Sequence, residues 1–208
     1  MKKHLSISIA TILALSIPGI AKAQFYITAE VGGVPSVSGA TLENFDEPSP
    51  SILTLSGTAY LMTGTDANGS APNFSGLTAA YFGEYPTSGP DATPYVAVAY
   101  AGLATLSFPA PERYLGLLWG SIDANNLLTF YDSANNVIGT VDGTDVGTSE
   151  DSYVNITSTT AFSSVVASNA GDSFEFDDVA YAPVPEPASL SLLAFGMFGI
   201  TLLRRHRG

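Results

Sequence analysis

Residues 130–143, FYDSANNVIGTVDG, carry the clearest indication of the fold. Two runs rich in apolar and β-branched residues flank a short polar segment, in which Asn135 and Asn136 tolerate positive φ angles. The pattern predicts a β-hairpin with strands at 127–132 and 137–141, connected by residues 133–136.

Strand-like runs separated by Gly, Asn, Asp and Pro continue on both sides of this hairpin. Apolar and polar residues alternate with a period of two at 153–157 and again at 173–177, and the phase slips at Asp177-Asp178, which predicts a β-bulge there. Outside the two ends of the chain, no long stretch has helical periodicity. We therefore expect an all-β domain, a β-sandwich or a jelly roll. The predicted strands are residues 25–31, 52–62, 77–82, 95–108, 113–122, 127–132, 137–141, 153–157, 162–167 and 173–181.

Charge is distributed unevenly along the 208 residues, which include 7 basic residues, 19 acidic residues and no cysteine. Between Gln24 and Pro187, Arg113 is the only basic residue, whereas all the acidic residues lie in this region. So negative a surface repels phosphate backbones and argues against nucleic-acid binding. Without disulfides, stability must come from a packed core, and residues 24–182 are long enough to form one as a single domain.

The same region lacks histidine as well as cysteine, so the usual general bases, thiol nucleophiles and zinc ligands are missing. Carboxylate chemistry remains, and a glycosidase needs two carboxylates at a defined separation. With 19 acidic residues, some pair meets that separation by chance. We expect a protein that is not an enzyme, with a carboxylate glycosidase as the weakest alternative.

Residues 1–23 have the features of a secretory signal peptide. Lys2 and Lys3 precede an apolar run at 5–20, and Ala21-Lys22-Ala23 provides the small-x-small pattern that signal peptidase cleaves. Gln24 is then the first mature residue. The alternative is an uncleaved membrane anchor.

Near the other end, residues 188–203 are sixteen uncharged residues. As a helix they would span about 24 Å, somewhat less than the ~30 Å hydrocarbon core, and arginines that reach the interface can extend that span. A buried core helix is the alternative, but the basic tail would then have nothing to pack against. We predict a single transmembrane helix whose following arginines stay in the cytoplasm, namely Arg204, Arg205 and Arg207.

A Pro-Glu-Pro triplet, the apolar segment and the basic tail follow one another in residues 183–208. This order resembles the PEP-CTERM sorting signal of exosortase-dependent surface proteins in Gram-negative bacteria. The resemblance implies that an exosortase recognises Pro185, Glu186 and Pro187 and removes the helix from an inner-membrane intermediate. The protein then reaches the cell surface or an extracellular, biofilm-type matrix. Both prolines keep the chain extended around Glu186, which suits recognition by a processing enzyme.

Residues 113–132, RYLGLLWGSIDANNLLTFYD, together with 173–181, SFEFDDVAY, resemble the ectodomains of some exosortase-dependent surface proteins. That resemblance implies a β-sandwich and no assigned activity. Trp119 has two interpretations: it packs in the core, or it stacks on a sugar ring beside Asp123, Asn125 and Asn126. The second interpretation makes a carbohydrate- or exopolysaccharide-binding module the alternative function.

The acidic stretch 142–151, DGTDVGTSED, is a candidate calcium loop because oxygen ligands suit hard cations. Its spacing matches neither an EF-hand nor a nonapeptide repeat, and a solvated acidic turn is the alternative. We expect no other cofactor. The calcium candidates are Asp142, Asp145, Glu150 and Asp151.

Overall fold

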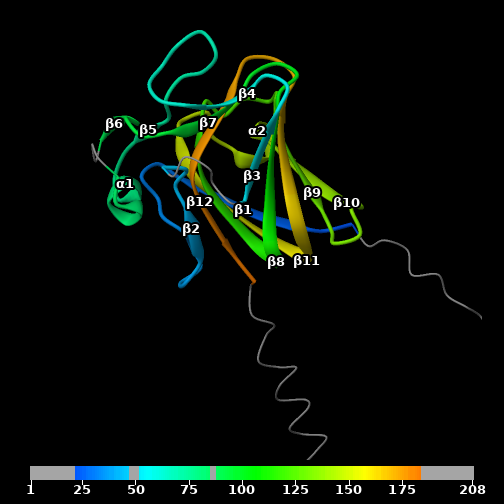
Figure 1. Cartoon of the computed structure of the whole chain (residues 1–208). Helices are drawn as coiled ribbons and strands as arrows, with labels where there is room; N and C mark the ends of the chain where they lie inside the picture. Colours follow the sequence, from blue (N-terminus) through cyan, green and yellow to red (C-terminus); the bar gives the residue numbers. More distant parts are fainter. Residues whose placement is uncertain (1–21, 47–51, 85–87, 184–208) are drawn as a thin grey trace, which may run out of the picture.

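The structure, a computed structural model, describes residues 22–46, 52–84 and 88–183 (Figure 1). Strands make up most of its regular structure, together with two short helices, which confirms the all-β prediction. The elements are β1 (Phe25–Glu30), β2 (Thr41–Glu43), β3 (Leu53–Ser56), β4 (Ala59–Met62), β5 (Asn73–Phe74), α1 (Thr78–Phe82), β6 (Gly89–Pro90), β7 (Tyr95–Val98), β8 (Leu103–Gly120), β9 (Asn126–Tyr131), β10 (Val137–Asp142), α2 (Gly143–Val146), β11 (Ser152–Asn169) and β12 (Phe174–Ala182).

A 10-stranded antiparallel sheet contains all the strands except the β5–β6 pair, in the order β10-β9-β11-β8-β12-β7-β4. Strand β1 pairs with β11, β2 with β12 and β3 with β8. The first part of β8 pairs with β3 and its second part with β12, while the two parts of β11 pair with β1 and β9. The two long strands therefore run through both layers of a sandwich-like sheet.

Strand β8 is continuous where the sequence predicted two separate strands. Its ladder with β11 shifts register twice, between Thr157 and Ser164, opposite the segment that contains Pro109 and Pro111. Proline has no N–H to donate to a neighbouring strand, so the ladder is interrupted while the chain stays extended. The bend at these prolines lets one strand serve two layers. In Figure 1, β8 and β11 turn at the lower end of the molecule.

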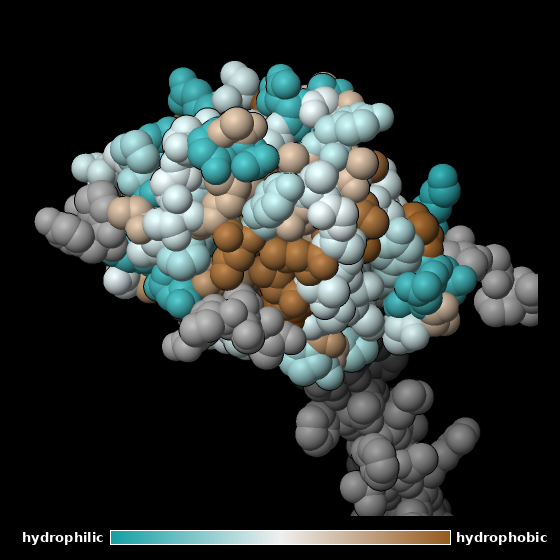
Figure 2. All heavy atoms as spheres, turned by 45° about the horizontal axis from the view of Figure 1, so that its top comes forward, coloured by the Kyte–Doolittle hydropathy of each residue, from teal (hydrophilic) through white to brown (hydrophobic). Residues whose placement is uncertain are grey.

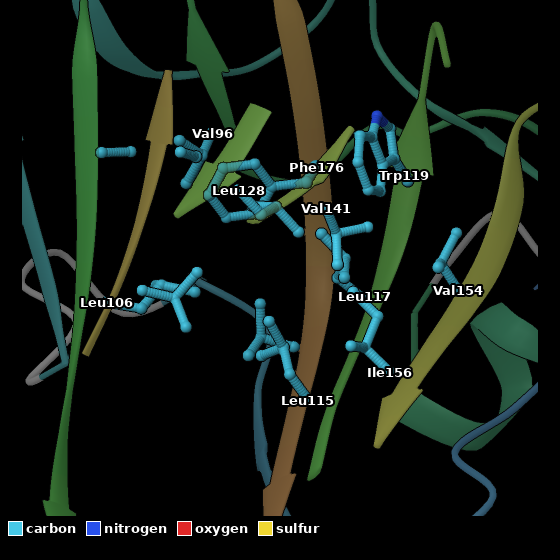
Figure 3. Close-up of a cluster of buried hydrophobic side chains, with 14 of the residues drawn as sticks. Val96, Leu106, Leu115, Leu117, Trp119, Leu128, Val141, Val154, Ile156 and Phe176 are labelled. Carbon is cyan, nitrogen blue, oxygen red and sulfur yellow. The ribbon is translucent and has the colours of Figure 1, made fainter. Parts of the chain in front are cut away.

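Large side chains from both layers meet in one hydrophobic core (Figure 3). Phe174 and Phe176 of β12 are both fully buried there, as their alternation predicted. The register of β12 against β8 shifts between Asp177 and Ala180, and Asp178 has a φ of 52°, which confirms the predicted bulge. Other core residues include Val96, Leu106, Leu115, Leu117, Trp119, Leu128, Val141, Val154 and Ile156.

The predicted hairpin is also confirmed, with β9 and β10 antiparallel and Tyr131 opposite Val137. Asn135 has a φ of 62°. The Asp132 carboxylate accepts from the backbone N–H groups of Ala134 at 2.9 Å and Asn136 at 2.8 Å, so local hydrogen bonds close the turn.

Residues 77–82, predicted as a strand, instead form helix α1, and the prediction is wrong there. Gly76 and Gly83 both have positive φ angles, and the N–H of Glu84 donates to the Ala79 carbonyl at 2.8 Å. The glycines turn the chain at both ends of a short apolar run, and the backbone satisfies its hydrogen bonds locally. Periodicity cannot distinguish a strand from one helical turn over so few residues.

The predicted sorting motif, transmembrane helix and all but the last two residues of the predicted signal peptide lie outside the described residues. Within residues 22–46, 52–84 and 88–183, no helix is long and apolar enough to cross a bilayer. The division into residues 1–23, 24–182 and 183–208 stays a prediction.

Candidate functional site

A polar pocket of about 480 Å³ lies at one end of the sandwich. Four loops contribute to it, those of residues 63–72, 99–102, 121–125 and 170–173, together with Glu175 of β12. These loops gather at the top of Figure 1, and Figure 2, with that end turned forward, shows mostly hydrophilic and neutral residues across its upper part. Its polar lining includes Asp66, Asn68, Ser121, Asp123, Asp172 and Glu175.

Glu175 is the most unusual of these residues because it is only 2% exposed. Its Oε1 atom accepts from the Ser70 N–H at 2.9 Å and from the Ser173 hydroxyl. Its Oε2 atom is buried and has no hydrogen-bond partner among the described residues. Burial raises the pKa of Glu175, the bonds from Ser173 and Ser70 act in the opposite direction, and the Ser121 side chain adds a smaller lowering effect. The carboxyl group at the pocket wall thus has one oxygen, Oε2, that is buried and lacks a hydrogen bond of ordinary geometry within the described residues.

Gly69 lets the 63–72 loop approach this carboxyl group. A Cβ atom at Gly69 would lie 2.9 Å from the Ala97 Cβ and 3.0 Å from Glu175 Oε1. The adjacent turn is closed by its own hydrogen bonds, since Asp66 Oδ1 accepts from the Asn68 N–H at 2.7 Å and the Asp66 N–H donates to the Gly69 carbonyl at 3.0 Å. Close backbone packing therefore positions Ser70 for its bond to Glu175.

Tyr100 also lines the pocket and is 69% exposed. Two hydrogen bonds hold the backbone of its turn. The Gly102 N–H donates to the Ala99 carbonyl at 2.8 Å, and the Thr58 hydroxyl donates to the Tyr100 carbonyl. Ala101 has a φ of 63° at the tip of this turn. The backbone is anchored while the ring remains accessible, and an accessible aromatic face is suited to a planar, cyclic or cationic ligand.

Buried amides join the loops beneath the pocket. Asn126 Nδ2 donates to the Ser121 carbonyl at 2.6 Å, and Asn169 Nδ2 donates to Asn126 Oδ1 at 2.7 Å. The Gly171 N–H then donates to Asn169 Oδ1 at 2.5 Å. This chain of bonds fixes the 121–125 loop against the 170–173 loop, so Asn126 has a structural role.

The sugar-contact set predicted from the sequence is not assembled. Trp119 is fully buried, stacked on Phe174 with ring centroids 4.6 Å apart and planes at 23°, so its core interpretation is correct and stacking on a sugar is excluded (Figure 3). Asn125 is not among the described residues that line the pocket. Asp123 does line the pocket, as part of the 121–125 loop, whereas Trp119 does not line it.

The candidate calcium loop is likewise not gathered around one point. Asp142 caps α2, with its Oδ1 accepting from the Thr144 N–H at 2.8 Å, and Asp145 Oδ2 accepts from the Asp142 N–H at 3.0 Å. Thr144 accordingly lowers the pKa of Asp142. Asp151 accepts from the backbone N–H groups of Ser121 and Asn73.

These carboxylates bond the nearby backbone, as acidic residues in turns commonly do. Glu150 lines a separate shallow hollow beside α2. No three Asp, Glu or His residues in the described parts of the chain are arranged to hold a metal ion, and calcium binding by the 142–151 stretch stays a prediction.

A second acidic group, which the sequence did not reveal, lies at the β12 bulge. We call Glu84, Asp91, Asp177 and Asp178 the bulge acid cluster; all four are buried. Asp177 Oδ2, Asp91 Oδ2 and both carboxyl oxygens of Asp178 have no hydrogen-bond partner within the described chain.

Burial is the largest cause that raises the pKa of Asp177, followed by the neighbouring carboxyl of Asp91. Burial also raises the pKa of Asp178, and Glu84 and Asp91 add to it. These raised pKa values favour the protonated forms of Asp177 and Asp178, because a buried and unpaired carboxylate is costly. Alternation alone does not indicate that these carboxyl groups are buried, because every residue of β12 is buried in the folded protein.

Comparison with protein families matches residues 183–207 to the PEP-CTERM protein-sorting motif. The chain carries a PEP-CTERM sorting motif. The motif implies exosortase-dependent sorting, with export and membrane-anchored passage to the cell surface. Its match contains all the sorting residues predicted from the sequence, namely Pro185, Glu186, Pro187, Arg204, Arg205 and Arg207.

The PEP-CTERM motif begins directly after β12, at the end of the sandwich opposite the pocket (Figure 1). Among solved structures, CsCBM6-3 from Clostridium stercorarium, determined in complex with cellobiose, has 11% sequence identity and a TM-score of 0.36. The similarity covers 71% of this chain and 99% of that chain. No curated protein matches the sequence.

Proposed function

We propose that this chain is a non-enzymatic protein of the cell surface or extracellular matrix, processed by an exosortase near Pro185, Glu186 and Pro187. The match of residues 183–207 to the PEP-CTERM motif carries the proposal. In this proposal, signal peptidase removes residues 1–23 during export. Residues 188–203 then hold the intermediate in the inner membrane, with the arginines on the cytoplasmic side, until exosortase cleavage releases the domain.

Replacing Glu186 by Ala in the native host tests the sorting step. We expect full-length protein to accumulate in the membrane fraction, because the processing enzyme loses the acidic group between two prolines. Glu150→Ala is the matched control, since Glu150 is an exposed glutamate outside the motif. Normal maturation of the Glu186→Ala protein, at the same rate as the control, would refute the sorting proposal.

The absence of enzymatic activity is part of the same proposal. It is supported by the composition of residues 24–187, which include no His, Cys or Lys, and by a pocket whose chemically active groups are carboxylates. A carboxylate glycosidase is the competing enzyme. Release of reducing ends from any polysaccharide by the purified full chain, lost in Glu175→Gln, would overturn the non-enzymatic assignment.

Glycan binding at the pocket is a second candidate function, consistent with a matrix location. Two observations favour it: the accessible ring of Tyr100, and the buried Oε2 of Glu175, a residue of the same pocket lining, which lacks a partner among the described residues. The pocket volume lies within the ~300–1,000 Å³ typical of small-ligand sites. Strand β12, the last strand before the sorting motif, ends away from the loops that form the pocket (Figure 1). A glycan array probed with the full chain tests this candidate, and an array without any binding would remove it.

A further inference from the structure

We infer that the pocket recognises the protonated amino group of a partly or fully deacetylated amino-sugar polysaccharide. This inference rests on the second candidate function and specifies its ligand. Tyr100 would contact the face of the sugar ring, and the Glu175 carboxyl group would turn its buried Oε2 toward the pocket to accept a hydrogen bond from the ammonium group. Asp123 and Asp172, which line the same pocket, would complete the acceptor set.

The charge of the pocket selects a cation. Four carboxylate residues line it, and none of the described residues in its lining is basic. Arg113 and Lys22 are the only basic residues in the described parts of the chain, and neither lines the pocket. An anionic polysaccharide such as a polyuronate would be repelled by this surface. A neutral sugar would leave the negative charge of the pocket uncompensated.

Glu175 gives this general attraction a specific position. It is almost completely buried, Ser70 and Ser173 satisfy only Oε1, and Oε2 has no partner in the described structure. A buried acceptor without a partner is costly, and a charged donor relieves that cost through a strong hydrogen bond. An ammonium group has three N–H donors, so it can use Glu175 and two further carboxylates together.

Two features favour a sugar amine over other cations. No three carboxylates in the described residues are arranged to hold a metal ion, so a bare divalent cation lacks its ligand set. The pocket also combines an accessible aromatic ring with amide and hydroxyl groups, including Asn68 and Ser121. A lysine side chain would use only the carboxylates, whereas a pyranose ring also uses the aromatic face and the hydroxyl groups.

Calorimetric titration of the full chain in detergent micelles, in buffer near neutral pH, tests the inference. The probes are a fully deacetylated glucosamine hexamer, the fully acetylated hexamer, a glucose hexamer with the same linkage, and a lysine hexapeptide. We expect the deacetylated hexamer to bind at least about tenfold more tightly than each of the others, because it alone provides both the amine and the ring.

Glu175→Gln should weaken binding of the deacetylated hexamer by at least about tenfold, since it removes the charge but keeps the shape. Glu30→Gln is the matched control because Glu30 is exposed on β1, outside the pocket, and carries the same charge. We expect the control to change the affinity less than about twofold. Tyr100→Ala, on an exposed turn, provides a second variant whose folding does not depend on the buried carboxyl, with an expected loss of about two- to fivefold.

The outcomes separate this inference from the candidate function beneath it. Equal or tighter binding of the acetylated or glucose hexamer would refute amine recognition and leave glycan binding standing. Equal binding of the lysine hexapeptide would assign the pocket to basic proteins and refute the inference. If Glu30→Gln and Glu175→Gln weaken binding equally, the attraction depends only on the net charge of the protein. That result would also refute the inference. If none of the four probes binds, both the inference and the glycan-binding candidate fail.

Discussion

Strand β12 places carboxyl groups in two contrasting environments only two residues apart. Glu175 lies beside an open pocket and has hydrogen bonds to one of its oxygens. Asp177 and Asp178 lie in the bulge acid cluster, fully buried, with most of their oxygens unpartnered within the described structure. Burial raises the pKa in both places, but only the first environment can be relieved by a ligand from solvent. At Asp177 and Asp178, protonation removes the unfavourable buried charge.

Acidic residues in one strand can therefore take part in binding or can limit stability, depending on whether their carboxyl groups are accessible from solvent. A carboxyl group at a pocket can bind a cation without unfolding the protein. Ionisation of a carboxyl group buried in the fold, such as that of Asp177 or Asp178, lowers the stability of the folded state.

The largest effect that we expect is on the pH dependence of unfolding. A raised pKa in the folded state means that the folded protein binds more protons than the unfolded chain, so stability falls as pH rises above the ordinary carboxyl pKa of about 4. Each unit of raised pKa corresponds to about 1.4 kcal/mol, and we expect a loss of at least about 3 kcal/mol between pH ~5 and pH ~8. Urea unfolding of the full chain across this range measures it.

At the acid end the sign reverses. Asp142 has a lowered pKa because Thr144 bonds its ionised form, so its contribution is lost as pH falls below about 4. A stability that instead rises steadily from pH ~5 to pH ~8 would contradict the raised pKa values of Asp177 and Asp178.

Gly69→Ala should have the next largest effect and acts on the pocket alone. The added Cβ would lie 2.9 Å from the Ala97 Cβ and 3.0 Å from Glu175 Oε1, so the loop must move and the Ser70 bond must weaken. We expect a loss of about 1–3 kcal/mol in the free energy of unfolding. A loss of less than about 0.5 kcal/mol would show that the close packing at Gly69 is unimportant.

Asp178→Asn should stabilise the protein by about 1–2 kcal/mol near pH ~8 and by almost nothing near pH ~4. Asn has the same shape, cannot ionise and tolerates the φ of 52° at this position. Thermal unfolding of the variant and the parent at both pH values measures the change. The exposed Glu30→Gln control should change stability by less than about 0.5 kcal/mol at either pH. A destabilised Asp178→Asn protein near pH ~8 would mean that the ionised form is favoured there, against the cause assigned to its pKa.

Glu175→Gln should have the smallest effect on stability, no more than about 1 kcal/mol at neutral pH. Glutamine keeps an acceptor for the Ser70 N–H, and the other oxygen had no partner in the described structure. The same urea unfolding experiment provides the measurement. A loss comparable to that of Gly69→Ala would mean that Glu175 stabilises the fold. The contrast between Glu175 and the bulge acid cluster would then disappear.

The sequence-based predictions were more accurate where the deciding interactions join residues that are close together in the chain. The hairpin around Asn135 was predictable because Asp132 and its neighbours close that turn locally. The bulge at Asp178 was predictable from the change of phase. Helix α1 was missed because two glycines, and not periodicity, decide a run so short. The predicted break between two strands was wrong because Pro109 and Pro111 bend β8 without ending it.

The candidate site was far less predictable. Of the sugar-contact residues inferred from the sequence, only Asp123 lines the pocket, and Trp119 belongs to the core. Tyr100, Asp66 and Glu175 come from different loops and strands, and no spacing in the sequence indicates that they meet. Only the packing of four loops at one end of the sandwich brings them together.

By itself, the sequence determined the all-β class, the position of the strongest turns and the sorting motif of residues 183–207. Each of these depends on neighbouring residues: alternation, turn chemistry, and a contiguous apolar segment between a proline pair and arginines. Tertiary structure alone decided which carboxyl groups face solvent and which are buried. Solvent access depends on contacts between residues far apart in the chain, such as that between Ser70 and Glu175, and local pattern carries no information about them.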